Sequence, residues 1–460
     1  MENQDSFFNQ VFSLKGKVNR KNYFIWGIVL FAIKYNIDRL LSLYFTGDPW
    51  KFFSYFTSYE RHSIFMLSDS DQLFYLTLVL IALPFIWIGT VLTIKRLQSS
   101  GLSPWLVLIF FIPFINILSF LILSILPEKE STNASSESLK PLSRIIPKNK
   151  TGSALFAVGF SIFVVIILTL FSTHFLKDYG WGVFLGLPFI LGFSSSLIYG
   201  YHVHRKFSQC VGVTLTSLFL TSALLLILAI EGIICIAMAF PIGLIIALIG
   251  TALGYAIQSK NKPGAPMSLG SIIVMMPLLM SLESATRPEA EIYSVSSSVI
   301  IDAPSTVVWN NVIAFSTLPD PEEFVFKSGI AYPIKAEIQG RGVGAVRCCI
   351  FNTGKFVEPI VVWEDEKILE FTVDEQPHPM TELSPYGEID APHLDGYFAS
   401  TRGQFLLIPQ KDGTILLKGT TWYYNKLWPN SYWKIWSDYL LHKIHLRVLN
   451  HIKKLSEQTV

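Results

Sequence analysis

The chain has 460 residues, more than one compact domain usually holds, so we expect two or three structural units. Hydrophobic residues make up 51% of the chain and charged residues only 15%. Because a soluble domain carries about 25% charged residues, part of this surface must face lipid. The formal net charge is only +2 and no strongly basic stretch stands out, which argues against a nucleic-acid partner.

The spacing of the four cysteines indicates neither a disulfide framework nor a zinc site. They are Cys210, Cys235, Cys348 and Cys349. The first two lie in or beside apolar runs, and the last two are adjacent, so they would point to opposite faces of a strand. We therefore predict no metal site and no cofactor.

Eight apolar segments are candidates for membrane spans, because about 20 apolar residues cross the hydrocarbon core. They are residues 23–45, 73–94, 105–126, 154–176, 181–203, 211–230, 233–257 and 268–282. The first segment contains charges and the last is short. The sequence therefore predicts an all-α transmembrane bundle of seven or eight helices.

Basic residues before the first apolar run predict an uncleaved anchor with a cytoplasmic N-terminus. They are Lys15, Lys17, Arg20 and Lys21. Eight spans would place the C-terminal domain in the cytoplasm, although the basic loop at residues 129–150 would then lie outside. A re-entrant first segment would reverse both assignments. We favour eight spans because Lys95 and Arg96, after the second span, suit the cytoplasm.

Three charged residues interrupt the first apolar segment: Lys34, Asp38 and Arg39. Lys34 and Asp38 are four residues apart, which places them on one helical face. Charges at membrane depth are costly and usually partnered, so these residues are candidates for a functional site. The structural alternatives, which we favour, are an ion pair that holds helices together or an amphipathic helix at the membrane interface.

Composition divides the chain into four parts. Residues 1–127 and 152–285 are two membrane blocks, and residues 128–151, rich in Ser, Lys, Glu and Pro, form a linker between them. Residues 291–460 have the composition of a soluble domain. At its start, apolar residues from Tyr293 onward alternate with serines, which predicts a strand with one buried face.

The soluble part is predicted to be an α+β domain. Pro304 opens a short helix, where its missing N–H group costs nothing. Further strands are expected at residues 345–351, 356–363, 368–373, 397–408 and 415–424. In residues 431–456, apolar side chains recur at helical spacing. The order of elements predicts an antiparallel sheet wrapped around a long C-terminal helix.

Short motifs mark the first quarter of the chain. They are Phe-Ser-x-x-Gly-x-x-x-Arg at residues 12–20, Lys-Arg-Leu at 95–97, Ser-Ser-Gly-Leu-Ser-Pro-Trp at 99–105 and Phe-Ile-Pro-Phe-Ile-Asn at 111–116. In these motifs the chain resembles the DUF805 family of small bacterial inner-membrane proteins, whose function is not established. The resemblance implies the bacterial inner membrane as the location. Many members have His-Asp where Gln98 and Ser99 stand here, which leaves the role of that pair open.

Two further segments lie in the soluble part: the run VIIDAPSTVVW at residues 299–309 and the glycine-containing GRGVG at 340–344. With these and the closing helix, the chain resembles the SRPBCC superfamily (START-like, polyketide-cyclase-like). The resemblance implies a helix-grip fold with an apolar pocket between the sheet and the long helix. It implies no single reaction, because this fold serves many functions.

The predicted pocket is mostly apolar, and ligand pockets generally hold about 300–1,000 Å³. Its expected apolar and aromatic wall consists of Trp309, Tyr423, Trp433, Trp436 and Leu440. Arg402 is the expected polar anchor, with His393 as second choice. Lys418 prefers water, so the alternating set Ile415, Leu417, Thr421 and Tyr423 should face the helix.

The leading functional hypothesis is a membrane-anchored binding module for an apolar small molecule or lipid. One alternative is an enzyme that acts on such a ligand in the same cavity, for which His393 and Asp395 are a conceivable acid–base pair. Another is a transporter that uses the helix bundle. We assign no catalytic residue, and we expect His442 and His445 to be packing or surface residues rather than metal ligands.

Overall fold

The structure is a computed structural model that describes residues 16–51, 55, 69–112, 114–128, 145–258, 265–287 and 289–458. Lys15, Pro113 and most of the predicted linker, residues 129–144, lie outside the described residues. Contacts within the chain form two compact units. The first consists of residues 1–224 and 239–288, and the second of residues 225–238 and 289–460. The four-part division proposed above stays a prediction.

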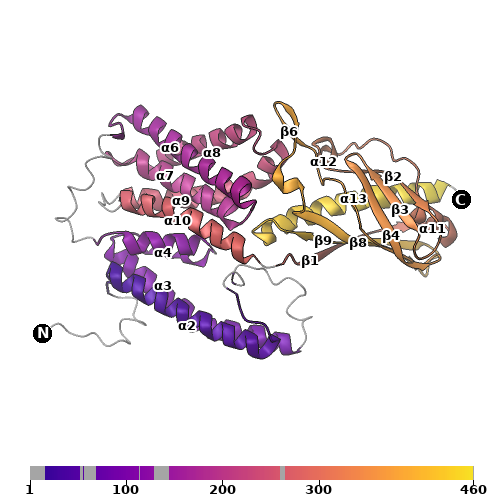
Figure 1. Cartoon of the computed structure of the whole chain (residues 1–460), viewed down its shortest axis with the longest axis horizontal. Coiled ribbons are helices and arrows are strands. Elements are labelled where there is room, and N and C mark those ends of the chain that lie inside the picture. Colours follow the sequence, from indigo (N-terminus) through magenta and orange to yellow (C-terminus); the bar gives the residue numbers. More distant parts are fainter. Residues whose placement is uncertain are drawn as a thin grey trace. The chain divides into compact units, whose positions relative to one another are not determined.

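The first unit is helical (Figure 1). Its α-helices are α2 (Arg20–Thr46), α3 (Asp69–Ser99), α4 (Ile115–Ile125), α6 (Lys150–Leu170), α7 (Leu187–Tyr199), α8 (Phe207–Ile227), α10 (Ala265–Thr286) and most of α9 (Ile233–Gln258). A 3-10 helix (Pro104–Phe111) and two π-helical turns (Phe171–Leu176 and Gly182–Gly186) complete the unit.

Six helical stretches among the described residues are long and apolar enough to cross a bilayer. They are Leu73–Ser99, Lys150–Leu176, Gly182–Tyr199, Phe207–Ile227, Ile233–Gln258 and Ser268–Thr286. Large apolar side chains such as Leu76, Phe163 and Val274 are more than half exposed, as lipid-facing residues are. The chain is therefore a multi-pass membrane protein. Helix α2 is also long but carries the three predicted intramembrane charges.

The predicted span at residues 105–126 is not one helix. The 3-10 helix Pro104–Phe111 is followed by a break, and the short apolar helix α4 begins only at Ile115. Phe114 has a φ angle of +64°, which lies outside the range of a right-handed helix. The segment is apolar as the sequence indicates, but apolar composition does not show where the backbone turns.

Two residues of the Lys-Arg-Leu and Ser-Ser-Gly motifs connect the first helices. Arg96 is fully buried and donates from Nε to the Leu123 carbonyl at 2.8 Å and from Nη2 to the Leu126 carbonyl. These carbonyls lie at the C-terminal end of α4, where unpaired C=O groups carry partial negative charge. The Ser99 hydroxyl accepts the N–H of Val18 at 2.8 Å. Arg96 thus joins α3 to α4, and Ser99 joins α3 to the residues that precede α2.

The charges of α2 divide into a pair and a separate residue. Asp38 is fully buried and accepts from Lys34 Nζ, with 2.5 Å to Oδ1. The Tyr55 hydroxyl donates to the second oxygen, Oδ2, also at 2.5 Å. Arg39 is exposed. The Lys34–Asp38 pair is the arrangement expected for a structural ion pair, whereas Arg39 does not share its burial.

The second unit contains a seven-stranded antiparallel sheet and a long helix, α13 (Asn430–Gln458), along which the sheet curves (Figure 1). The strand order is β1-β9-β8-β5-β4-β3-β2. The strands are β1 (Ile292–Ile301), β2 (Pro333–Gln339), β3 (Val346–Phe351), β4 (Gly354–Glu364), β5 (Ile368–Thr372), β8 (Phe398–Pro409) and β9 (Ile415–Asn425). A separate hairpin is formed by β6 (Glu382–Ser384) and β7 (Gly387–Ile389), and α11 (Ser305–Ile313) and α12 (Phe324–Lys327) are short.

Alternation along β9 decides which face of the sheet is buried. Ile415, Leu417 and Tyr423 are 0–4% exposed, whereas Lys418 lies on the opposite face and is more exposed. The buried set joins Leu449 of α13 and other apolar residues in the core. The inward face predicted from the preference of Lys418 for water is confirmed, and so is the α+β helix-grip fold class.

Residues 225–238, which lie in the predicted second membrane block, pack with the C-terminal domain. Ile234, in the first turn of α9, forms a buried cluster with Phe326 and Ile330. The Tyr432 hydroxyl donates to the carbonyl of Met238 at 2.5 Å. The start of α9 thus belongs to the second unit, although α9 continues as a candidate membrane span.

Candidate ligand-binding cavity

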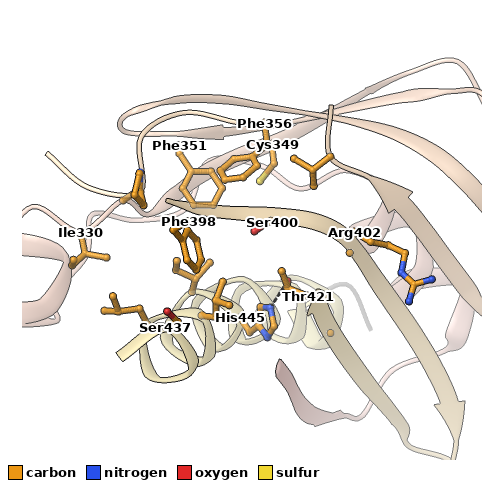
Figure 2. A pocket seen from close by; sticks show the side chains of 18 of the residues that line it. Ile330, Cys349, Phe351, Phe356, Phe398, Ser400, Arg402, Thr421, Ser437 and His445 are labelled. Carbon is orange, nitrogen blue, oxygen red and sulfur yellow. Dashed lines mark hydrogen bonds between the residues drawn. The ribbon is translucent and has the colours of Figure 1, made fainter. Parts of the chain in front are cut away.

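A cavity of about 170 Å³ lies between α13 and the curved sheet (Figure 2). Most of its wall is apolar. Its aromatic lining residues are Phe351, Phe356, Phe371, Tyr397, Phe398, Phe405, Trp433 and Trp436. This volume is below the usual range for drug-sized ligands, about 300–1,000 Å³, and close to that of an engineered apolar cavity of about 150 Å³ that binds benzene.

The periodicity of the elements explains which side chains reach the cavity. In the strands, alternate residues such as Cys349 of β3 and Thr421 of β9 point inward, and Figure 2 shows both on the cavity wall. On α13, Leu441, His445 and Val448 recur at intervals of three and four residues and cover the opposite side.

Five of the predicted pocket residues lie on the cavity wall: His393, Arg402, Trp433, Trp436 and Leu440. Two others lie elsewhere. Trp309 packs edge-on against Trp363 in the core, with 5.6 Å between ring centroids. Tyr423 is fully buried and donates its hydroxyl to Asp438 Oδ1 at 2.5 Å. Both side chains fill space that the sequence alone could not distinguish from a cavity.

Arg402 touches the cavity lining but does not act as its polar anchor. Its guanidinium stacks 3.8 Å from the centroid of the Trp422 ring and donates to Glu370 Oε1 at 3.2 Å. Figure 2 shows this group pointing away from the cavity. The reason is a register shift in β8 after Ser400, which places Arg402 opposite the outward residue Trp422.

The buried ion pair on the cavity wall is instead Arg347 with Glu358. These residues are direct cross-strand partners on β3 and β4, and both are nearly inaccessible to water. Burial raises the pKa of Glu358, an effect that the neighbouring Arg347 opposes. Sequence reasoning missed this pair. Its signal was the position of Arg347 two residues before Cys349, on the same face of a strand.

A second polar group on the wall is a short chain of hydroxyls and imidazoles. Thr421 Oγ1 lies 2.7 Å from His445 Nε2 (Figure 2), and His445 Nδ1 lies 3.1 Å from the buried Ser297 hydroxyl. That hydroxyl also lies 2.7 Å from His442 Nδ1. Burial, assisted by His442, lowers the pKa of His445 to about 4, so its imidazole is neutral at physiological pH.

At another part of the wall, His393 lies between two buried carboxylates. His393 Nδ1 is 3.1 Å from Glu231 Oε2, and Nε2 is 3.6 Å from Glu382 Oε1. Burial alone would lower the pKa of His393, but hydrogen bonds and charges from Glu231 and Glu382 raise it to about 9. Asp395, the conceivable partner in an acid–base pair, contacts His378 at 3.0 Å instead.

The carboxylate of Glu382 caps the start of α9. It accepts the backbone N–H groups of Ile234 at 3.1 Å and Cys235 at 2.8 Å. Such groups have no partner within the helix, and the helix dipole favours a negative charge there. A Cβ atom at Gly232 would lie 1.9 Å from Glu382 Oε2, so this position must be glycine for the carboxylate to enter.

Residues 11–135 match the DUF805 family, which is described as a protein of unknown function. This match confirms the resemblance in the first quarter of the chain. No curated protein matches the chain.

Solved structures with a similar C-terminal fold include a point mutant of norcoclaurine synthase from Thalictrum flavum in complex with a transition-state analogue. It is 13% identical, with 38% of this chain and 99% of that chain covered and a TM-score of 0.25. The Zhui aromatase/cyclase from a Streptomyces species is 12% identical, with 36% and 95% covered and a TM-score of 0.24. The helix-grip fold that the SRPBCC resemblance implies is evident from the strand order and long helix of the second unit itself.

Proposed function

We propose that the second unit binds a small apolar molecule in the cavity between α13 and the sheet, and that the helices of the first unit anchor the protein in a bilayer. The observation that carries this proposal is the cavity itself, of about 170 Å³ and walled mainly by aromatic and aliphatic side chains. This volume suits a small molecule or the end of one acyl chain better than a whole two-chain lipid.

Polar groups on the wall would orient the ligand. Ligand pockets typically combine an apolar wall with a few polar groups that fix one orientation. The Arg347–Glu358 pair and the Thr421–His445 hydrogen bond supply such groups here. An apolar ligand with one hydroxyl, carbonyl or carboxyl group fits this wall best.

The proposal includes a location. Lys17, Arg20 and Lys21 precede α2, which favours a cytoplasmic N-terminus under the positive-inside tendency. Together with the family match, this supports a bacterial inner-membrane protein. Six spans, an even number, would then return the chain to the cytoplasm and place the C-terminal domain there. The proposed parts are residues 1–127, 128–151, 152–285 and 291–460.

The test is photolabelling of the full chain in detergent with a short fatty acid that carries a diazirine. Labelled peptides identified by mass spectrometry should come from β8, β9 and α13. Gly419 lines the cavity, and a Cβ atom there would make only ordinary contacts of 3.7 Å, so Gly419→Leu should fill the cavity without disrupting the fold. We expect labelling of these peptides to fall at least five-fold.

The matched control is Lys418→Leu, which adds the same side chain one residue earlier, on the opposite face of β9. It should leave labelling unchanged. Circular dichroism should show that both proteins are folded. If the cavity peptides are then labelled equally in Gly419→Leu and in the unmodified chain, the proposal is contradicted.

An enzyme acting on the same ligand is the second candidate. It is favoured by the Thr421 hydroxyl, which faces the cavity 2.7 Å from a neutral imidazole, the arrangement by which a base activates a hydroxyl.

A further inference from the structure

Cysteine spacing predicts no metal site, but the fold brings one cysteine beside residues far away in the sequence. We propose that Glu231, Cys235 and His393 form a binding site for a divalent transition-metal ion, with zinc as the best fit. One donor atom from each residue (a carboxylate oxygen, the thiol sulfur and an imidazole nitrogen) lies within 4.8 Å of the other two. All three residues are at most 8% exposed. The site therefore brings together three ligand types inside one compact unit.

The spacing of the donors is close to that of a tetrahedral site. With zinc bonds of about 2.0 Å to nitrogen and oxygen, neighbouring ligands in a tetrahedron are about 3.3 Å apart. His393 Nδ1 and Glu231 Oε2 are 3.1 Å apart. With a zinc–sulfur bond of about 2.3 Å, the sulfur needs to lie about 3.6 Å from each of them. It lies within 4.8 Å of both, so each distance would shorten by at most about 1.2 Å.

The second nitrogen of His393 has the partner that a metal-bound imidazole usually has. Such an imidazole generally donates its other N–H to a carboxylate, which fixes the ring. His393 Nε2 faces Glu382 Oε1 at 3.6 Å, and Glu382 is itself held by the N–H groups of Ile234 and Cys235. We therefore assign Nδ1, 3.1 Å from Glu231, to the metal. Glu382 is then a positioning residue, which Nε2 would reach by a small rotation of the ring.

The donor set selects the kind of ion. Calcium and magnesium prefer oxygen ligands, whereas thiolate and imidazole suit zinc and its neighbours in the first transition row. Binding displaces the thiol proton of Cys235 and the Nδ1 proton of His393, and these two protons leave with the solvent. Because one divalent cation replaces two protons, the buried cluster gains no formal charge.

Three protein ligands leave one tetrahedral position open, which is typical of zinc sites that bind water or substrate. His393 also lines the apolar cavity, so an open position here would adjoin it. The metal site does not depend on the proposed apolar ligand, because its donors and its readout are separate.

The test is a Co²⁺ titration of the full chain. The protein is purified in detergent without a polyhistidine tag and is first treated with EDTA. A Co²⁺ ion bound by a thiolate gives a sulfur-to-metal charge-transfer band in the near ultraviolet. We expect this band to saturate at one Co²⁺ per chain and to disappear when Zn²⁺ is added. A purely structural ion network would give no such band.

Cys235→Ser should abolish the band, whereas Cys210→Ser, which replaces a buried cysteine outside both the cluster and the cavity, should retain it. If Cys235→Ser does not fold, His393→Gln and zinc content by elemental mass spectrometry give a second readout, with at least a ten-fold loss of bound zinc expected. A folded chain that binds neither Co²⁺ nor Zn²⁺, or a band that survives Cys235→Ser, would overturn the proposal.

Discussion

Glu283 in the helical unit and Glu382 in the second unit each cap the start of a helix. Glu283 accepts the backbone N–H groups of Trp181 at 2.6 Å and Gly182 at 3.1 Å, at the start of a helical stretch. Glu382 does the same for the first turn of α9. In both places a buried carboxylate satisfies helix-start donors that lack a partner in their own helix.

The two regions differ in the cation beside the carboxylate. Glu283 lies 3.6 Å from Arg287, which also pairs with Asp178 at 2.5 Å. Glu382 instead faces His393. An arginine is always charged, so the first cluster is fixed, whereas a histidine can release its proton and bind a metal. A buried carboxylate that caps a helix can therefore belong to a permanent ion cluster or to an exchangeable one, depending on a single neighbouring side chain.

Breaking the ion cluster around Arg287 should reduce stability the most. Arg287→Ala would leave the buried carboxylates of Asp178 and Glu283 without their cation, and removing one partner of a buried pair costs about 3–5 kcal/mol. We expect a much lower yield of monodisperse protein and a lower thermal midpoint in detergent. Arg341→Ala, at an exposed pair with Asp365, is the control and should change little. Equal behaviour of the two variants would refute the structural role of the Arg287 cluster.

His445 lies beside hydroxyl groups rather than carboxylates, and its pKa is lowered, whereas that of His393 is raised. The pKa of His445 is about 4 in the fold and about 6.5 when unfolded. Because the folded value is the lower one, the neutral imidazole contributes fully above pH 6.5, and stability is lost as pH falls from about 6.5 to 4. The loss amounts to at most about 3 kcal/mol.

The measurement is the thermal midpoint of the full chain at several pH values in this window, compared with His445→Gln. The midpoint should fall more steeply with acidification in the unmodified chain. His378→Gln, at an exposed histidine, should follow the unmodified chain. Parallel curves for all three proteins would show that His445 does not titrate as proposed.

Replacing the glycines that leave room for the two carboxylates should reduce stability the least. A Cβ atom would lie 2.1 Å from Glu283 Oε1 at Gly180 and 1.9 Å from Glu382 Oε2 at Gly232. Gly180→Ala and Gly232→Ala should therefore each displace a cap, with a loss of about 1–3 kcal/mol in thermal denaturation. Gly159→Ala, in open space within α6, should be neutral or stabilising. Only Gly232→Ala should also weaken Co²⁺ binding, and weakening by Gly180→Ala would count against separate roles.

The fold could be predicted where neighbouring residues carry the information. Lys418 between Leu417 and Gly419 shows which face of β9 points toward solvent. The helical spacing of Trp433 and Trp436 indicates the apolar side of α13. The break near Phe114 could not be predicted from composition, because one helix and two short ones have the same apolar content.

The site depended on information that local patterns lack. A register shift after Ser400 turns Arg402 outward, and no residue type in the sequence indicates such a shift. Glu231 and His393 of the charged cluster are separated by most of the second half of the sequence, and a single sequence does not show that they meet. The available signal was Glu231 next to Gly232 between two apolar runs, a carboxylate in an unfavourable place.

The membership of residues 225–238 in the second unit has a consequence for biogenesis. This segment leaves the ribosome roughly 150 residues before Glu382 and His393, which at about 5–20 residues per second is a delay of roughly 7–30 seconds. During that interval Glu231 directly precedes α9, a candidate span that reaches the membrane-insertion machinery before the C-terminal domain is made. The newly made segment must therefore be kept from aggregation or mispairing until translation delivers its partners, so the C-terminal domain matures last, on a piece of chain synthesised long before it.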